Sequence, residues 1–234
     1  SEPSCLEDYK SETYGTSYLR SFFDTVKAGT DSTIKRCFVT GVSPVTMDDL
    51  TSGFNIGTNY SLSPEFNEMT GFNEEEVRAM LDYYATTCQF HHSTDELIEA
   101  MKPWYDNYCF ARESLGDDRI FNCDMTLYYL RWQVDFHCSP GEMADKNIRT
   151  DYSKLKMLAR IDRDSVQEEN RMGTIEEIAA KGEILVDLHT SFPAEWVTDI
   201  DNFRSLLYYY GLLTMCGTRG DRLRMCIPNN CVRE

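Results

Sequence analysis

Apolar side chains recur at helical spacing in several segments of the chain, separated by polar stretches. In residues 18–26, Leu19, Phe22 and Val26 share one helical face, which predicts a helix that ends near Lys27. The same spacing predicts further helices after Asn73, after Ser93, and at residues 125–134, 152–161 and 198–210.

Two of these helices carry start signals. Asn73 is followed by three glutamates, which place acidic groups at the positive N-terminal end of a helix. Ser93 or Thr94 can cap the next helix, with Glu96 following, and Pro103 lies near its end. Both helix starts are therefore predicted to within a residue or two.

The clearest strand predicted in the first half is IKRCFVTGV, residues 34–42. It breaks at Gly41 and leads into Pro44, as a buried strand leads into a loop. Only 33 residues precede Ile34, so we expect a parallel sheet here to be incomplete. Its open edges favour self-association, or coverage by residues 1–10.

The last third combines helices with β segments. Residues 183–188 are strand-like, and the apolar runs 212–216 and 223–227 flank a loop that contains glycine, which predicts a hairpin. A helix followed by a hairpin is typical of a winged-helix-like module. Residues 139–151 are polar and predict a loop, with a domain boundary near residue 140.

The composition indicates a folded, acidic protein. Of 234 residues, 41% are hydrophobic, and the net charge is −16, which disfavours nonspecific binding to nucleic acid. No run approaches the roughly 20 apolar residues of a membrane span, and the first residues lack the pattern of an export signal. We therefore expect a cytoplasmic protein with no membrane contact.

Nine cysteines without a CxxC pair predict reduced thiols, with a disulfide or a metal ligand as the alternative. Cys88 with His91 and His92 suggests zinc, and Cys109 or Cys123 could complete the ligands. Adjacent histidines point in different directions, and the chain has no second ligand pair. We expect no metal site.

Seven short segments follow one another in a recognisable order. They are FVTGVSP (38–44), LTSGFNI (50–56), FNEM with GF (66–72), EEEV (74–77), WYD (104–106), YYGLLT (209–214) and IPN (227–229). Together they span nearly the whole chain. This series resembles the predicted AAA-ATPase-like proteins of gut and anaerobic bacteria, which often carry a C-terminal PD-(D/E)xK nuclease domain.

The resemblance implies binding and hydrolysis of ATP with magnesium, coupled to a conformational change. In that family a GK[ST] phosphate-binding loop and an acidic strand resembling IDEYD precede the matching region, and neither pattern occurs in this chain. We therefore expect this chain alone to bind no nucleotide and to be inactive. Asn107 also stands where the family usually has glycine, and Cys123 where it usually has proline.

The predicted fold class is α+β and mostly helical. By resemblance, residues 1–58 are the last helix and strand of an α/β P-loop core, and residues 59–138 form a helical lid. Residues 139–234 form a winged-helix-like C-terminal module.

Candidate site residues follow from the same resemblance. Thr40, at the end of the predicted strand, matches a polar sensor position, and Ser43 and Asn55 are candidates for nucleotide contact in a complete ATPase. Alternatively, Thr40 and Ser43 only tie up the turn around Gly41 and Pro44 through hydrogen bonds to the backbone.

The segment WYDNY, residues 104–108, predicts a rigid packing junction between lid and core. In a functional alternative, Asp106 locks the lid, or Arg112 senses phosphate. The marked residues of the segment are Trp104, Tyr105, Asp106 and Tyr108.

Three arginines, Arg219, Arg222 and Arg224, surround the predicted hairpin loop, where a wing could contact phosphates. Asp199 and Asp201 flank the preceding helix, so we do not expect nucleic acid to bind there. The main hypothesis is the C-terminal part of an AAA-ATPase-like protein. A nucleotide-independent interaction or scaffold module, with a protein partner or self-association, is the alternative, and a nucleic-acid-binding regulator is a third hypothesis.

Overall fold

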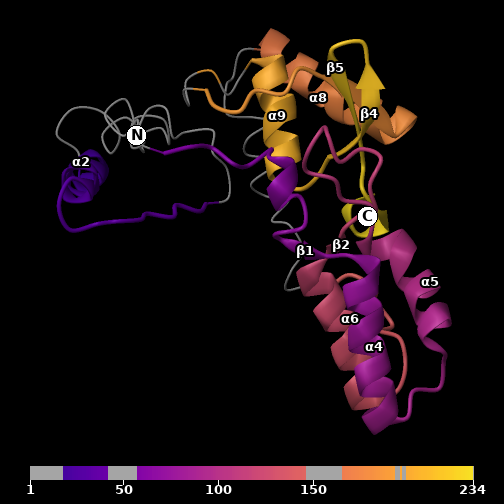
Figure 1. Ribbon diagram of the computed structural model, residues 1–234. Helices are drawn as coiled ribbons and strands as arrows, with labels where there is room; N and C mark the ends of the chain where they lie inside the picture. Colours follow the sequence, from indigo (N-terminus) through magenta and orange to yellow (C-terminus); the bar gives the residue numbers. More distant parts are fainter. Residues whose placement is uncertain (1–17, 42–56, 146–164, 193–195, 197–198, 234) are drawn as a thin grey trace, which may run out of the picture.

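The computed structural model describes residues 18–41, 57–145, 165–192, 196 and 199–233 (Figure 1). Within these ranges the protein is α+β and mostly helical, with seven α-helices and two small antiparallel sheets. None of the described helices combines the length and apolarity needed to cross a membrane. The helix expected at residues 152–161 lies outside the described residues.

Helix α2, Tyr18–Thr30, confirms the first predicted helix and extends it past Lys27. The strand predicted at residues 34–42 is wrong over its described part: residues 34–41 form no strand, and nearly all of them are exposed. Phe38 is 75% exposed. A strand needs the backbone of a neighbouring strand, and none of the described strands pairs with this segment.

Three helices form a bundle with its own apolar core: α4 (Glu74–Cys88), α5 (Thr94–Tyr105) and α6 (Cys123–Phe136). A short 3-10 helix, η1 (Pro64–Phe66), precedes them. At one end of the bundle, β1 (Gly71–Phe72) pairs antiparallel with β2 (Phe121–Asn122). This pairing brings the starts of α4 and α6 together.

Both predicted helix starts in the bundle are confirmed, and each is a capping box. The Asn73 side chain accepts a hydrogen bond from the Glu76 backbone, and the Glu76 carboxylate accepts one from the Asn73 backbone. Ser93 and Glu96 make the same reciprocal pair at α5. Each box satisfies backbone N–H groups that the first turn leaves without partners.

The C-terminal module runs α8 (Ser165–Lys181), β3 (Glu183–Val186), α9 (Ile200–Tyr209), β4 (Thr214–Arg219) and β5 (Arg222–Cys226). The predicted hairpin is confirmed as β4 and β5, and the three strands lie in the order β3-β5-β4. A second apolar core lies between this sheet and the helices. The last helix, α10 (Asn230–Arg233), returns to the bundle and contacts α5.

Short segments of the chain cross between the bundle and the C-terminal module (Figure 1). Cys109, just after α5, is buried in the core of the C-terminal module. Cys231, at the end of the chain, packs against the core of the bundle. Each part therefore contributes residues to the core of the other.

Candidate functional site

Of the three site residues proposed near the predicted strand, the structure describes only Thr40, so their role in nucleotide contact stays a prediction. Thr40 is exposed in the segment after α2, which forms no strand, so it does not lie at the end of a strand as expected. Ser43 and Asn55 lie outside the described residues.

The segment WYDNY lies where the bundle meets the C-terminal module. Tyr105 is fully buried, and its hydroxyl donates a hydrogen bond of 2.7 Å to the Met143 carbonyl. Tyr108 is also buried, and its backbone bridges to Ile120. Trp104 is only half-buried and packs against the bundle core.

Asp106 caps the C-terminal end of α5, and the residue is half-buried. The Oδ1 atom is buried and has no hydrogen-bond partner among the described residues. Burial raises the pKa of Asp106, although a hydrogen bond from the Asn107 backbone and the positive charges of Lys102 and Arg119 act in the opposite direction. Lys102 and Arg119 act on the Asp106 carboxylate through their charge rather than through a hydrogen bond, and the lock between lid and core through Asp106 stays a prediction.

Asn107 and Asn229 fasten this segment to the C-terminal end of the chain. The Asn107 side chain donates to the Pro228 carbonyl at 2.8 Å, and the Asn229 side chain donates to the Asp106 carbonyl at 3.1 Å. Asn107 has a φ of 85°, a left-handed conformation that glycine adopts most readily and asparagine tolerates. This conformation explains why asparagine can replace the glycine expected here.

Two further polar side chains hold the chain just after WYDNY. Thr214, at the start of β4, accepts a hydrogen bond from the Cys109 N–H at 2.8 Å. Asn67 accepts from the N–H groups of Phe110 and Ala111 at 2.8 and 3.2 Å. The Asn67 and Thr214 side chains are themselves buried, so they satisfy backbone groups that water cannot reach.

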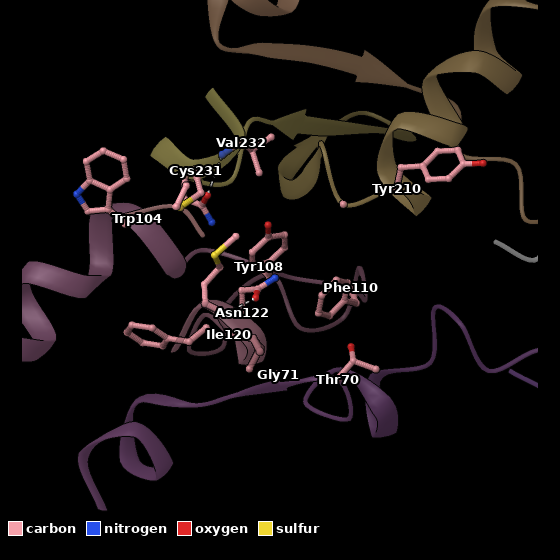
Figure 2. Close-up of a pocket in the computed structure, with 15 residues that line it drawn as sticks. Thr70, Gly71, Trp104, Tyr108, Phe110, Ile120, Asn122, Tyr210, Cys231 and Val232 are labelled. Carbon is pink, nitrogen blue, oxygen red and sulfur yellow. Dashed lines mark hydrogen bonds between the residues drawn. The ribbon is translucent and has the colours of Figure 1, made fainter. Parts of the chain in front are cut away.

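A cavity of about 240 Å³ lies at this junction (Figure 2). Thr70 and Gly71 lie on one side of it, and Cys231 and Val232 lie on another. Its remaining lining includes no charged side chain: Trp104, Tyr108, Phe110, Ile120, Phe121, Asn122, Met125, Ala144, Tyr210, Gly211 and Asn229. Such a lining suits an uncharged, largely apolar group rather than a phosphate.

Gly71 makes the narrow side of this cavity possible. A Cβ atom at this position would lie 2.1 Å from Ile120 Cγ2 and 2.6 Å from the Phe121 carbonyl oxygen. Only glycine therefore permits the β1 and β2 backbones to approach as they do.

Arg112 does not face the cavity. It is exposed and donates to the Asp221 carbonyl at 3.4 Å, in the turn between β4 and β5. This contact links the loop after α5 to the hairpin.

Two of the three hairpin arginines are engaged in ion pairs. Arg222 lies 3.1 Å from Asp187 and 3.8 Å from Asp201, and Arg224 pairs with Glu183. Their charge is therefore partly neutralised within the module.

The proposed zinc ligands are not assembled in the described part of the chain. No group of three or more histidine, cysteine or acidic side chains there could hold a metal ion. His92 lies 3.9 Å from Glu96, and the buried Cys109 thiol donates to the Ala111 carbonyl.

The sequence indicated WYDNY as a site, but it did not indicate Asn67, Thr214 and Asn229, whose side chains hydrogen-bond to the backbone at the junction. All three stand in segments that carry the family resemblance: FNEM, YYGLLT and IPN. Their shared location could have been suspected from that fact, because buried polar residues in separate motifs need partners. The backbone groups that each of these side chains binds could not have been predicted from the sequence.

A family model described as predicted AAA-ATPase matches residues 4–51, the family indicated by the motifs. The match covers about a fifth of the chain, and the junction motifs from residue 66 onward lie outside it. No curated protein and no solved structure matches the chain significantly.

Proposed function

We propose that this chain is the C-terminal part of an AAA-ATPase-like protein and that its helical bundle and C-terminal module act as one coupled unit. The observation that carries this proposal is the junction: Asn67, Thr214 and Asn229 come from three of the family-like motifs, Asn107 directly follows a fourth, and their side chains hold residues 106–111 and 228 through buried and partly buried hydrogen bonds. In this proposal the bundle moves with the C-terminal module, because these hydrogen bonds join the two parts.

The topology supports a winged-helix-like assignment for the C-terminal module. A helix, a strand, a second helix and a hairpin succeed one another, and β5 lies between β3 and β4. The hairpin then corresponds to the wing. Because Asp199 and Asp201 stand at the start of α9 and the wing arginines Arg222 and Arg224 pair with acids, we assign this module to protein contacts rather than to nucleic acid.

Nucleotide hydrolysis, in this proposal, belongs to the complete family protein with its magnesium. The sequence of this chain contains no GK[ST] loop, and the junction cavity has no charged side chain for a triphosphate. The contribution of this chain is mechanical: it carries a change at the ATPase core into the bundle and the C-terminal module.

Isothermal titration calorimetry with MgATP tests this assignment. We expect no saturable heat at millimolar nucleotide, where a Kd of 1 mM corresponds to about −4 kcal/mol. A stoichiometric isotherm in the micromolar range would show that the chain has its own nucleotide site and would refute the mechanical assignment.

A nucleotide-independent interaction module is the second candidate, and one surface favours it. Tyr128, Trp132 and Phe136 form an aromatic row along α6, with ring centroids 6.3 and 4.7 Å apart. Phe136 is 60% exposed at the end of this row. If the chain associates with itself through this row, the wild type should be a dimer in sedimentation velocity and Phe136→Ser a monomer. A monomeric wild type would contradict self-association through the aromatic row.

A further inference from the structure

Two cysteines lie near each other on the hairpin of the C-terminal module. In the ladder, Met215 pairs with Met225 and Gly217 pairs with Arg224, so Cys216 is an extra residue that forms a β-bulge. Cys226 lies on the facing strand next to Met225. A bulge re-aims the side chain of the extra residue, and diagonal neighbours in a ladder are within reach of each other.

The two thiols influence each other's ionisation: when Cys216 is a thiolate, the Cys226 thiol stabilises it as a hydrogen-bond donor. When protonated, the Cys216 thiol donates to the Arg224 carbonyl at 3.3 Å. Both cysteines are half-buried free thiols, so a small oxidant can reach them while bulk water is partly excluded.

The surroundings favour the thiolate at Cys216. The hydrogen bond from Cys226 is the largest cause that lowers the pKa of Cys216 to about 7, and the positive charges of Arg224 and Arg119 act in the same direction. Partial burial and the Glu183 carboxylate oppose them. The same interaction raises the pKa of Cys226, which stays a thiol when Cys216 ionises.

We propose that Cys216 and Cys226 form an oxidation site that reacts with hydroperoxides, with Cys216 as the nucleophile and Cys226 as the thiol that resolves the product. The bulge and the ladder register place the two cysteines at neighbouring positions of facing strands, and the two arginines favour negative charge at Cys216. The cysteine that reacts first and its partner are thereby distinguished.

The chemistry balances with hydrogen peroxide as the oxidant. The Cys216 thiolate attacks one peroxide oxygen, so an S–O bond forms, the O–O bond breaks, and hydroxide leaves and takes a proton to become water. The Cys226 sulfur, losing its proton, then attacks the Cys216 sulfenic acid: an S–S bond forms, the S–O bond breaks, and a second water leaves. Two thiols are oxidised by two electrons, and one peroxide is reduced to two waters.

Peptide mapping tests the site in the full chain. After exposure to hydrogen peroxide, alkylation of the remaining thiols and trypsin digestion without reductant, we expect residues 205–219 to be linked to residues 225–233, with the mass lowered by two hydrogen atoms. Fragmentation, or the same experiment on Cys231→Ser, distinguishes Cys226 from the neighbouring Cys231.

Two variants at one position separate the roles of Cys226. Cys226→Ser retains a hydroxyl donor but cannot form a disulfide, so Cys216 should stop at a sulfenic acid that dimedone traps. Cys226→Ala removes the donor, and the pH at which Cys216 alkylation reaches half its maximal rate should rise above that of Cys226→Ser. Arg224, Arg119 and Glu183 stay in place in both variants, so this difference isolates the hydrogen bond.

Exposed Cys138 in the same molecule is the internal reference. Near neutral pH, Cys216 should react with peroxide at least several-fold faster than Cys138. The proposal is overturned if Cys216 reacts no faster than Cys138, if no 205–219 to 225–233 link forms, or if Cys226→Ala leaves the pH profile of Cys216 unchanged. These outcomes are independent of MgATP calorimetry, so they leave the proposed function untouched.

Discussion

Gly71 shows how one residue fixes the junction. Its hydrogen atom occupies a place where a methyl group would lie 2.1 Å from Ile120 Cγ2 and 2.6 Å from the Phe121 carbonyl oxygen. The backbone oxygen cannot move without disturbing the pairing of β1 with β2. A steric requirement therefore explains this glycine.

Gly71→Ala should lower the free energy of unfolding by about 1–3 kcal/mol, because overpacking forces the backbone or Ile120 to shift. Urea denaturation measures the change. Gly116→Ala is the matched control: a Cβ there meets nothing within 4 Å, so we expect it to be neutral or slightly stabilising. Equal stability of the two variants would contradict the close approach.

The two aromatic residues that end α5 should differ in energetic weight. Tyr105 is fully buried and hydrogen-bonded to Met143, whereas Trp104 is half-buried at the rim of the cavity. Tyr105→Ala should therefore cost about 3–5 kcal/mol of unfolding free energy, and Trp104→Ala less. Urea denaturation measures this ranking. A greater loss for Trp104→Ala would reverse it.

Asp106 makes the stability of the protein depend on pH. Its folded pKa is raised above 3.8 by burial, so the folded state binds its proton more tightly, and this carboxyl destabilises the fold as pH rises through the folded pKa. Asp106→Asn removes that cost. The free energy of unfolding of the variant minus that of the wild type should increase from pH 3.8 upward and then level off. A flat difference would contradict the burial.

At the scale of elements, the capping boxes give the helices of the bundle sharp starts. Asn73→Ala removes the side-chain acceptor for the Glu76 N–H and should cost about 1 kcal/mol. Glu75→Ala changes an exposed residue in the same turn that makes no capping contact, so it should stay within about 0.5 kcal/mol. Thermal denaturation compares the stability of the two variants. An equal loss of stability would show that the Asn73 cap does not stabilise the helix.

The elements that could be predicted were those with local signals. The starts of α4 and α5 depend on residues three apart, and the β4–β5 hairpin depends on two apolar runs around a glycine. The two-residue strands β1 and β2 carry no such signal, because long-range pairing alone defines them. The prediction of a strand at residues 34–42 was wrong because the local pattern is typical of a strand, but no described strand lies beside this segment to pair with it.

At the scale of the whole molecule, the junction joins segments far apart in the sequence. The hydrogen bonds from Asn107 to Pro228 and from Asn229 to Asp106 span 121 and 123 residues, and the Cys109 to Thr214 bond spans 105. Family-like motifs mark Asp106, Thr214, Pro228 and Asn229 in the sequence. Their convergence could not be predicted, because no local spacing encodes which buried amide meets which carbonyl.

The central claim is that these contacts make the bundle and the C-terminal module one cooperative unit. Amide hydrogen exchange by mass spectrometry at increasing urea concentrations tests it most directly, with peptides from α4 and α6 compared with peptides from β4 and β5. The structure predicts that both sets lose protection at the same urea midpoint, because each core contains residues of the other part. Two separate midpoints would contradict the coupling and with it the mechanical role.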